Sequence, residues 1–529
     1  MSDPPAGRHG TADAHVSEHA RFGPFAALVI AALARFHGLG ARTLWTDEGS
    51  TWTAASLPLH ALIRRCVERD ASPPLYYLLT AWAIRGHDDE WHLRLVSALA
   101  SLLLVALTYR IARLGLGRSA STLAAMLTAL SPFQVMYAQE ARTYTLVAAL
   151  LVAATWAYAR LLRGDRGAWW SYVAATALGL WTQSIAALGV ATQGALAMLT
   201  PAGRRKLLPW LGGLAVAGAI YLPWAWYGRG VSEHLSSSHW YVPDTDALGI
   251  FKLLRAALLS PLPLVTAPPG STLHGLDAWM PRPIAWAVVA IPPLLALALS
   301  LPELARPDGR GLLARVAWAG WAVPVAAVFA ASLRHPLFLT RYFVFVTPFV
   351  SALVALGLTR VRWAPPRVLL SAWLVALALL GLARYEHDYS KEPWRDVAAA
   401  IGREALPGRT AVLVPFDVDP FAYYDRRLPH PVAAFEVGHP AEPFAAHYTP
   451  RQIDDMERAA GDHVARYDDV WVIVRSPNSE VRREVARRTE AVAAQGRALV
   501  TRTRWDSFTG PLRVTHWRRD STASAATAR

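Results

Sequence analysis

Apolar and polar residues follow one another in long blocks along most of this chain. Between residues 22 and 384, apolar runs are separated by short segments that carry charge, glycine or proline. An α-helix needs about 20 apolar residues to cross a bilayer, and the runs are close to that length. The pattern predicts eleven membrane-spanning helices. We expect them at residues 22–40, 93–112, 119–137, 143–162, 168–183, 185–202, 207–226, 283–301, 313–332, 342–359 and 367–384.

The composition agrees with a membrane protein. Hydrophobic residues make up 53% of the 529 positions and charged residues only 17%, which is too apolar for a soluble protein of this size. The formal net charge is +14, but the basic residues are almost all arginine and lie in short clusters between apolar runs. That distribution is typical of membrane topology and not of a nucleic-acid binding stripe. The single cysteine, Cys66, excludes an intrachain disulfide bond.

Arginine clusters occupy every second gap between the apolar runs, and they predict the orientation of the chain. Short loops rich in arginine and lysine stay in the cytoplasm. We therefore expect a multi-pass protein of the plasma (inner) membrane with a cytoplasmic amino terminus. The clusters are Arg110/Arg113/Arg118, Arg160/Arg163/Arg166, Arg204/Arg205/Lys206, Arg306/Arg310/Arg315 and Arg360/Arg362/Arg367.

The remaining gaps, and everything after residue 385, are predicted on the extracytoplasmic side. The first of these gaps, residues 41–92, contains an amphipathic stretch at 57–66 and an apolar segment at 72–82 that is too short to span. We expect both to be helices that lie in the membrane interface. The long outer gap at 227–282 is a candidate cover for a binding site, because loops of that length are usually functional or disordered.

The end of the chain has the composition of a soluble domain. Buried strands are predicted at residues 411–415 and 470–474, and a charged amphipathic helix at 479–495. Strands that alternate with helices indicate a small α/β domain. The chain therefore divides into a disordered cytoplasmic tail, a transmembrane domain, an extracytoplasmic α/β domain and a second disordered tail, at residues 1–21, 22–384, 385–519 and 520–529.

The candidate chemistry begins with an adjacent acidic pair, Asp47 and Glu48, directly after the first apolar run. A carboxylate beside the hydrocarbon of a membrane is costly to desolvate, so an acidic pair at this boundary is a functional hypothesis. The structural interpretation of the same pair is a solvated helix start, with aspartate as the N-cap and glutamate in the first turn. Both interpretations stay open on this dipeptide alone.

Two further polar clusters are predicted on the same side of the membrane. One follows the third apolar run and holds Gln139, Glu140 and Arg142, and the other places Arg341 at the outer end of the tenth run. The planar guanidinium of an arginine suits an anionic phosphate, and a glutamate two residues earlier can orient it or pair with it. Three polar clusters therefore converge on one face of the membrane.

In this order and topology, the motifs resemble the bacterial membrane glycosyltransferases of the GT-C superfamily, the group related to protein O-mannosyltransferases and to the lipid A aminoarabinose transferase. The resemblance covers most of residues 22–400. The motifs that carry it are Leu44-Trp45-Thr46-Asp47-Glu48, Pro73-Pro74-Leu75-Tyr76-Tyr77, Leu93-Arg94-Leu95, Gln139-Glu140-Ala141-Arg142-Thr143-Tyr144, Arg341-Tyr342 with Pro348, and Pro393-Trp394-Arg395-Asp396.

The resemblance implies transfer of a sugar from a polyprenyl-phosphate carrier to an envelope glycan, a glycolipid or a protein hydroxyl outside the membrane, usually with inversion. Asp47 would act as the catalytic base or help hold a divalent cation such as Mg²⁺ or Mn²⁺. Glu48, the second catalytic residue, would support Asp47 or contribute a contact to the metal. Arg142 and Arg341 would bind the donor phosphate and neutralise it as it leaves. The implied site is completed by Tyr144 and Tyr342 beside the phosphate and by four supporting residues, Glu140, Gln139, Arg94 and Tyr76.

One departure from the family and two rival classes of protein bear on this interpretation. Many relatives carry a histidine after the fifth span, where this chain has Trp181-Thr182-Gln183-Ser184, and the missing imidazole weakens a metal role there. The rivals are a transporter or lipid flippase without transferase activity, and a structural or sensory membrane protein. Transporters often show internal repeats and polar residues near the midplane, whereas the polar clusters here gather at one face.

Overall fold

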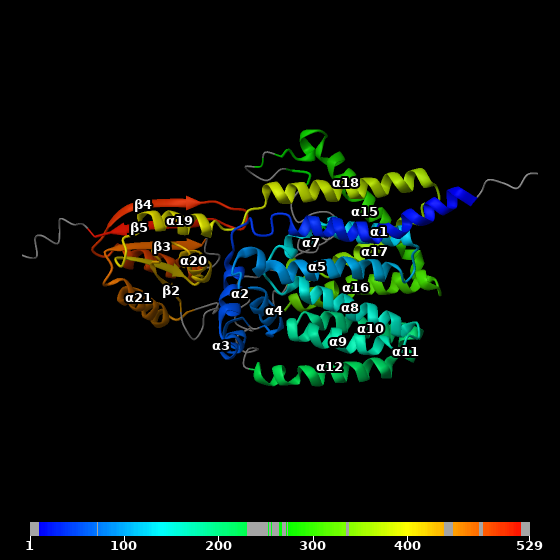
Figure 1. The fold of residues 1–529 in the computed structure, drawn as a ribbon, viewed down its shortest axis with the longest axis horizontal. Coiled ribbons are helices and arrows are strands. Elements are labelled where there is room, and N and C mark those ends of the chain that lie inside the picture. The colour runs from blue at the N-terminus through cyan, green and yellow to red at the C-terminus, as the bar shows by residue number, and fades with distance from the viewer. Residues whose placement is uncertain are drawn as a thin grey trace, which may run out of the picture.

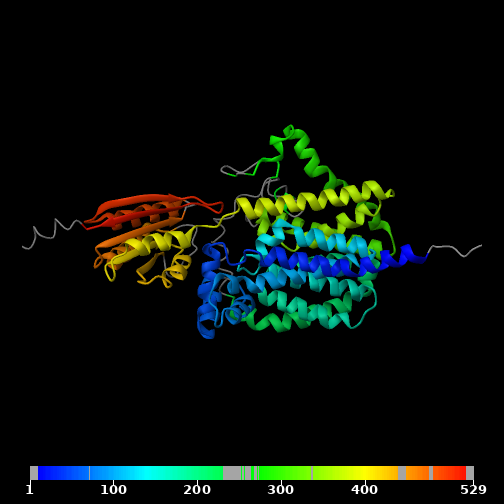
Figure 2. The same ribbon diagram turned by 45° about the horizontal axis from the view of Figure 1, so that its top comes forward.

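A bundle of long helices and an α/β domain lie end to end in the computed structural model of this chain (Figure 1). Three short helices lie between the two bodies: α2 (Thr46–Ser56), α3 (Leu59–Arg65) and α4 (Leu75–Ala83). Another short helix, α11 (Pro201–Arg205), lies at the opposite end of the bundle. Figure 2 shows the same order from a second direction. The structure describes residues 10–70, 72–229, 252, 255–256, 264–266, 271, 273–334, 338–438, 448–475 and 480–519.

Some predictions fall outside the described residues. They include most of the outer gap at 227–282, the first nine residues of the amino-terminal tail, and the tail at 520–529. The first helix, α1, begins at Gly10, inside the segment predicted as a tail.

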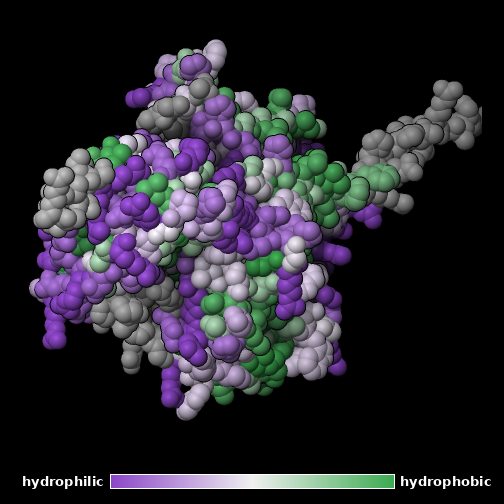
Figure 3. All heavy atoms as spheres, turned by 60° about the vertical axis from the view of Figure 1, so that its left-hand side comes forward, coloured by the Kyte–Doolittle hydropathy of each residue, from purple (hydrophilic) through white to green (hydrophobic). Residues whose placement is uncertain are grey.

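Each predicted span overlaps a helix of the bundle. Among the described residues, six helices are long and apolar enough to cross a membrane, and large apolar side chains lie exposed on the sides of the bundle (Figure 3). The chain is therefore a polytopic helical membrane protein, and the count of eleven spans stays a prediction. The helices are α1 (Gly10–Phe36), α5 (Glu90–Ala112), α6 (Arg118–Leu130), α8 (Tyr144–Leu162), α9 (Ala168–Thr182), α10 (Ala186–Leu199), α12 (Leu207–Tyr227), α15 (Arg282–Ser300), α16 (Gly309–Ser332), α17 (Val346–Leu358) and α18 (Ala364–Asp388).

The third predicted span, 119–137, is two helices and not one. α6 ends before Ser131, and α7 (Pro132–Ala138) follows it. Pro132 has no N–H to continue the helix and its ring clashes with the preceding turn. Ser131 caps the new helix, and the fully buried Arg35 of α1 donates hydrogen bonds to carbonyl oxygens at the end of α6. Shorter helical turns are η1 (Cys66–Asp70), η3 (Leu276–Ala278), η4 (Leu301–Ala305) and η5 (Thr340–Phe343).

The α/β domain contains one five-stranded sheet with the strand order β2-β1-β3-β5-β4. β1 is parallel to β2 and to β3, whereas β5 is antiparallel to β3 and to β4. The two predicted strands and the predicted helix are confirmed as β1, β3 and α22, and α18 continues to Asp388, past the predicted boundary at 385. The elements are β1 (Thr410–Pro415), β2 (Ala433–Val437), β3 (Asp469–Arg475), β4 (Ala498–Trp505), β5 (Leu512–Arg518), α19 (Trp394–Glu404), α20 (Asp419–Asp425), α21 (Pro450–Val464) and α22 (Glu480–Ala494).

The α/β domain shares a hydrophobic core with the outer end of the bundle. Val412 and Val414 of β1 pack with residues of α19 and α20, and Leu44 and Leu93 from the bundle side belong to the same cluster. The alternate residues of β1 pack with α21 and α22 on the other face of the sheet. Because one core joins the two bodies, the domain is held against the outer polar motifs.

Gly49 of α2 lies at the closest contact between the two bodies. A methyl group on Gly49 would lie 2.6 Å from the backbone nitrogen of Pro420, at the start of α20. We expect Gly49→Ala to destabilise the docked domain by about 1–3 kcal/mol, because a backbone atom cannot yield as a flexible side chain does. Thermal unfolding in detergent, together with proteolysis of the segment between α18 and α19, measures this effect. Gly212→Ala is the matched control, since its added methyl meets no atom within 4 Å, and equal midpoints for both variants would contradict the prediction.

Candidate functional site

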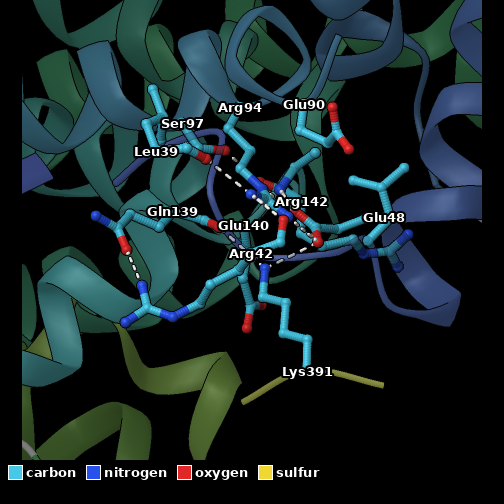
Figure 4. Close-up of polar contacts among 12 residues, drawn as sticks. Leu39, Arg42, Glu48, Glu90, Arg94, Ser97, Gln139, Glu140, Arg142 and Lys391 are labelled. Carbon is cyan, nitrogen blue, oxygen red and sulfur yellow. Dashed lines mark hydrogen bonds and ion pairs between the residues drawn. The ribbon is translucent and has the colours of Figure 1, made fainter. Parts of the chain in front are cut away.

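Glu48 lies at the centre of a fully buried network of charges (Figure 4). Arg94 binds it with two nitrogens, Nε at 2.7 Å from Oε1 and a second guanidinium nitrogen at 2.9 Å from Oε2. The Lys391 ammonium donates to Oε2 at 2.8 Å, and the backbone N–H of Ala141 donates to Oε1 at 2.9 Å. Burial raises the pKa of Glu48, but the charges of Arg94 and Lys391 outweigh it and hold the pKa at about 2. Glu48 is therefore ionised, and its two oxygens together accept four hydrogen bonds.

Asp47, the residue before Glu48, points to the other side of α2 and is 26% exposed. Its Oδ2 lies 3.8 Å from Nε of Arg142 and 3.6 Å from a guanidinium nitrogen of Arg341. These distances are too long for charge-assisted hydrogen bonds, which are near 2.7–2.9 Å. Arg142 also donates to the backbone oxygen of Asp47 at 3.2 Å. The structure thus brings together the three predicted residues from three distant parts of the chain.

Tyr144 lies beside both arginines. Its ring centroid is 5.9 Å from the guanidinium carbon of Arg142 and 5.8 Å from that of Arg341, and 6.4 Å from the ring of Tyr342. Tyrosine faces attract guanidinium groups at these distances. The two arginines are therefore held side by side, with the exposed carboxylate of Asp47 next to them.

Tyr76 and Gln139 support this arrangement from below the surface. The Tyr76 hydroxyl shares a 2.8 Å hydrogen bond with Ser97, and Ser97 donates to the backbone oxygen of Arg142 at 3.1 Å. Oε1 of Gln139 accepts from Arg42 at 2.7 Å, and Nε2 donates to the His37 carbonyl, near the end of α1, at 2.8 Å. Both side chains fix backbone segments near the site, and their supporting role stays a prediction.

Glu140 has a different environment from Glu48. One of its oxygens accepts a hydrogen bond from the Tyr389 hydroxyl at 3.2 Å, and its Oε2 is buried without a hydrogen-bond partner among the described residues. Burial raises the pKa of Glu140 well above its usual range, although the nearby Lys391 opposes this shift. Burial also lowers the pKa of Lys391. Glu140 therefore favours its neutral form, whereas Glu48 is held as an anion.

The predicted divalent cation finds few ligands here. All four donors to Glu48 occupy its two oxygens, so Glu48 does not fit as a metal ligand. Within the described ranges, no group of three or more histidine, cysteine, aspartate or glutamate side chains gathers in a way that would hold a metal ion. Asp47 is left as a single carboxylate with two arginines beside it, so the described residues offer a cation this one acidic ligand and the cation stays a prediction.

Lys391 and Glu392 were missed by the sequence analysis. Oε2 of Glu392 accepts from the backbone N–H of Thr46 at 3.2 Å and from its hydroxyl at 3.0 Å, so the segment after α18 contacts both sides of the acidic motif. One signal was available: the chain has only three lysines, Lys206, Lys252 and Lys391, among many arginines. A lysine in such a chain indicates a place where the smaller ammonium group is needed.

Residues 70–227 match the protein family described as dolichyl-phosphate-mannose-protein mannosyltransferase. This segment runs from the outer helix α4 through α12 and includes Arg142. Comparison with curated protein sequences finds no match for this chain.

The fold of the whole chain has a counterpart among solved structures. Its structure is similar to that of ArnT from Cupriavidus metallidurans in the apo state, with a TM-score of 0.57 and 15% sequence identity over 95% of this chain and 98% of ArnT. The same protein bound to undecaprenyl phosphate gives a TM-score of 0.55 at 15% identity, over 93% of this chain and 97% of ArnT. At this identity the likeness concerns the fold, and the chemistry must be argued from the site.

Glu48→Gln should destabilise the protein strongly. The neutral amide would leave Arg94 and Lys391 buried without their counter-charge, and breaking a buried ion pair in this way costs about 3–5 kcal/mol. Thermal unfolding in detergent measures the loss. Glu386→Gln is the control, because Glu386 is 32% exposed and pairs with Arg42 at 2.9 Å, so its loss should cost at most about 1 kcal/mol. A Glu48→Gln variant as stable as the control would show that the network does not hold the site together.

Glu140→Gln should change how stability depends on pH. The folded state favours the neutral carboxyl of Glu140, so its contribution to stability is present at low pH. That contribution is lost as the pH rises from the ordinary glutamate pKa of about 4.3 towards neutrality. The amide of glutamine does not ionise, so the variant should gain stability relative to the unmodified protein between pH 5 and pH 8. Parallel pH profiles of the two unfolding midpoints would contradict a neutral Glu140.

Proposed function

We propose that this protein transfers a sugar from a polyprenyl-phosphate donor to a hydroxyl of an extracytoplasmic acceptor, with Asp47 as the general base. The observation that carries the proposal is the half-buried carboxylate of Asp47 beside the two guanidinium groups of Arg142 and Arg341. The match of residues 70–227 to a mannosyltransferase family supports it, as does the similarity to ArnT bound to undecaprenyl phosphate.

The chemistry needs a base and cations at the same place. Asp47 takes the proton of the acceptor hydroxyl, and the hydroxyl oxygen forms a bond to the anomeric carbon of the sugar. The bond between that carbon and the phosphate oxygen breaks, and the lipid phosphate leaves with the electron pair. Attack from the side opposite the leaving group inverts the configuration, and a general base contributes about 10²–10⁴-fold to such a step.

Arg142 and Arg341 stabilise the negative charge that develops on the leaving phosphate. Fixed cations aimed at developing charge are among the largest contributions to catalysis, since they need no reorganisation during the reaction. Their loose contacts with Asp47, at 3.8 and 3.6 Å, leave room for a phosphate to take over their hydrogen bonds. Tyr144 and Tyr342 complete the phosphate side of the site.

Glu48 has a positioning role in this proposal. Because consecutive residues on a helix point about 100° apart, the buried anchor at Glu48 directs Asp47 outwards. Arg94, Tyr76 and Gln139 hold the surrounding backbone. The divalent cation stays a prediction, with Asp47 as its only predicted ligand, because both carboxylate oxygens of Glu48 already accept two hydrogen bonds each.

The proposed topology has eleven spans with the amino terminus in the cytoplasm of the plasma (inner) membrane. The arginine clusters support this orientation, and α2, α3, α4 and the α/β domain all lie at the end of the bundle opposite to α11. The donor lipid would then approach from the outer leaflet, and the acceptor would be an envelope glycan, a glycolipid or a protein hydroxyl.

Asp47→Asn should abolish sugar transfer without unfolding the protein. Asparagine keeps the size of the side chain but cannot take a proton, so we expect a loss of about 10²–10⁴-fold in turnover. Transfer of radiolabelled sugar from polyprenyl-phosphate donors to envelope extracts measures the rate. Asp455→Asn, at a half-exposed position of the α/β domain, controls for the substitution itself. Full activity of Asp47→Asn would remove Asp47 from the reaction and contradict the proposed mechanism.

A further inference from the structure

A polar cluster at the carboxyl ends of β1 and β3 has no role in the sugar transfer described so far. Its members are Phe416 and Asp417 directly after β1, Arg475 at the end of β3, and Arg482 in α22; we call it the switch-point cluster. β2 and β3 lie on opposite sides of β1, and both are parallel to it. Open α/β sheets bind their ligands outside the carboxyl ends of the strands at such a point, where the order of the strands reverses.

Phe416 has a strained backbone at this point. It is the one non-glycine residue with a positive φ, 70°, in the described part of the chain. A bulky residue in this conformation costs about 1–3 kcal/mol, and such residues concentrate at functional sites. The strain places the Phe416 ring under the guanidinium of Arg482, 4.5 Å from its centroid, and parallel to Tyr448.

Both arginines of the cluster lie beside Asp417, and Arg475 has a second carboxylate partner in Glu392. Asp417 lies 3.7 Å from Arg475 and 3.5 Å from Arg482, both longer than a strong charged hydrogen bond. Burial lowers the pKa of Arg482, Asp417 offsets part of this shift, and the neighbouring charge of Arg475 adds to it. Because both guanidinium groups make only long contacts with Asp417, an anionic ligand that replaces this carboxylate could bind them more closely.

The switch-point cluster is connected to Asp47 through Glu392. Arg475 donates to Oε1 of Glu392 at 2.6 Å, and Oε2 of Glu392 accepts the hydrogen bonds from Thr46, the residue before Asp47. Arg475 also interacts electrostatically with Asp47. One shared carboxylate therefore joins Arg475 to the residue that precedes the proposed base.

We propose that the switch-point cluster binds an anionic group of the acceptor, a phosphate or a carboxylate, and so holds the acceptor hydroxyl close to Asp47. Arg475 and Arg482 supply the bidentate donors that such groups prefer. The inference rests on the proposed sugar transfer and narrows the acceptor to an acidic one, such as a phosphorylated glycolipid or an acidic glycan. The lipid phosphate of the donor is bound separately, at Arg142 and Arg341.

A binding experiment tests the cluster without any sugar transfer. Inorganic phosphate is titrated against the full-length protein in detergent, and the rise in unfolding midpoint is recorded for Arg142→Gln, in which the donor side is weakened. We expect phosphate to stabilise Arg142→Gln but to lose most of this effect in Arg142→Gln/Arg482→Gln. Arg142→Gln/Arg502→Gln is the charge-matched control, since Arg502 is 55% exposed on β4. Equal phosphate shifts in the two double variants would overturn the proposal.

A kinetic experiment then separates acceptor from donor. Lipid extracts and delipidated envelope glycans are offered as separate acceptors, with the donor held at saturation. Arg482→Gln should raise the KM for one acceptor fraction on the order of tenfold, which corresponds to about 1.4 kcal/mol of lost binding. The donor KM should stay unchanged, and Arg482→Lys should restore part of the acceptor affinity.

The two hypotheses fail in different ways. An acceptor KM that does not change in Arg482→Gln, or a donor KM that rises with it, would overturn the role of the cluster and leave the transferase intact. No transfer by the unmodified protein from any donor would contradict the proposed function, and the phosphate titration would still decide whether the cluster binds anions.

Discussion

The arrangement of the candidate site depends on the hydrogen bonds and ion pairs of the buried Glu48 carboxylate. Glu48 belongs to α2. The groups that donate hydrogen bonds to it come from α5, from the segment after α7 and from the segment after α18, so it joins four parts of the chain. A charge can stay buried only if such partners surround it. The adjacent Asp47 is therefore presented outwards on a helix that cannot rotate without breaking the network.

The same constraint connects the membrane domain to the α/β domain. Lys391 and Glu392 bind the two sides of the acidic motif, and they stand directly before α19. Gly49 allows α20 to approach α2 at backbone distance, and a common hydrophobic core fills the contact. Glu392 connects Arg475, at the end of β3, to Thr46 beside Asp47, and this link is the geometric basis for the proposed acceptor site.

The sequence predicted the parts of this structure that depend on local patterns and topology. Long apolar runs and the alternation of arginine-rich gaps brought Asp47, Arg142 and Arg341 to one face, because helices that cross a membrane must deliver alternate loops to the same side. The sequence contains the Ser131–Pro132 pair that separates α6 from α7. This pair lies inside a long apolar run, and the length of that run led to the prediction of one helix. Glu48 and Glu140 are the same residue type and differ in their buried surroundings, which no local pattern reveals. The roles of Phe416 and Arg482 depend on the strand order of the sheet, which was not predicted.

The central claim is that the site uses a lipid-linked sugar at the outer face of the membrane. Purified protein in lipid nanodiscs can be offered radiolabelled polyprenyl-phosphate sugars or nucleotide sugars, each together with envelope extract, and the labelled product counted. We expect transfer from a polyprenyl-phosphate donor and none from a nucleotide sugar, because Arg142 and Arg341 lie beside Asp47, where a lipid-linked phosphate is proposed to bind. Transfer from nucleotide sugars alone, or movement of the lipid across the membrane without loss of its sugar, would contradict it.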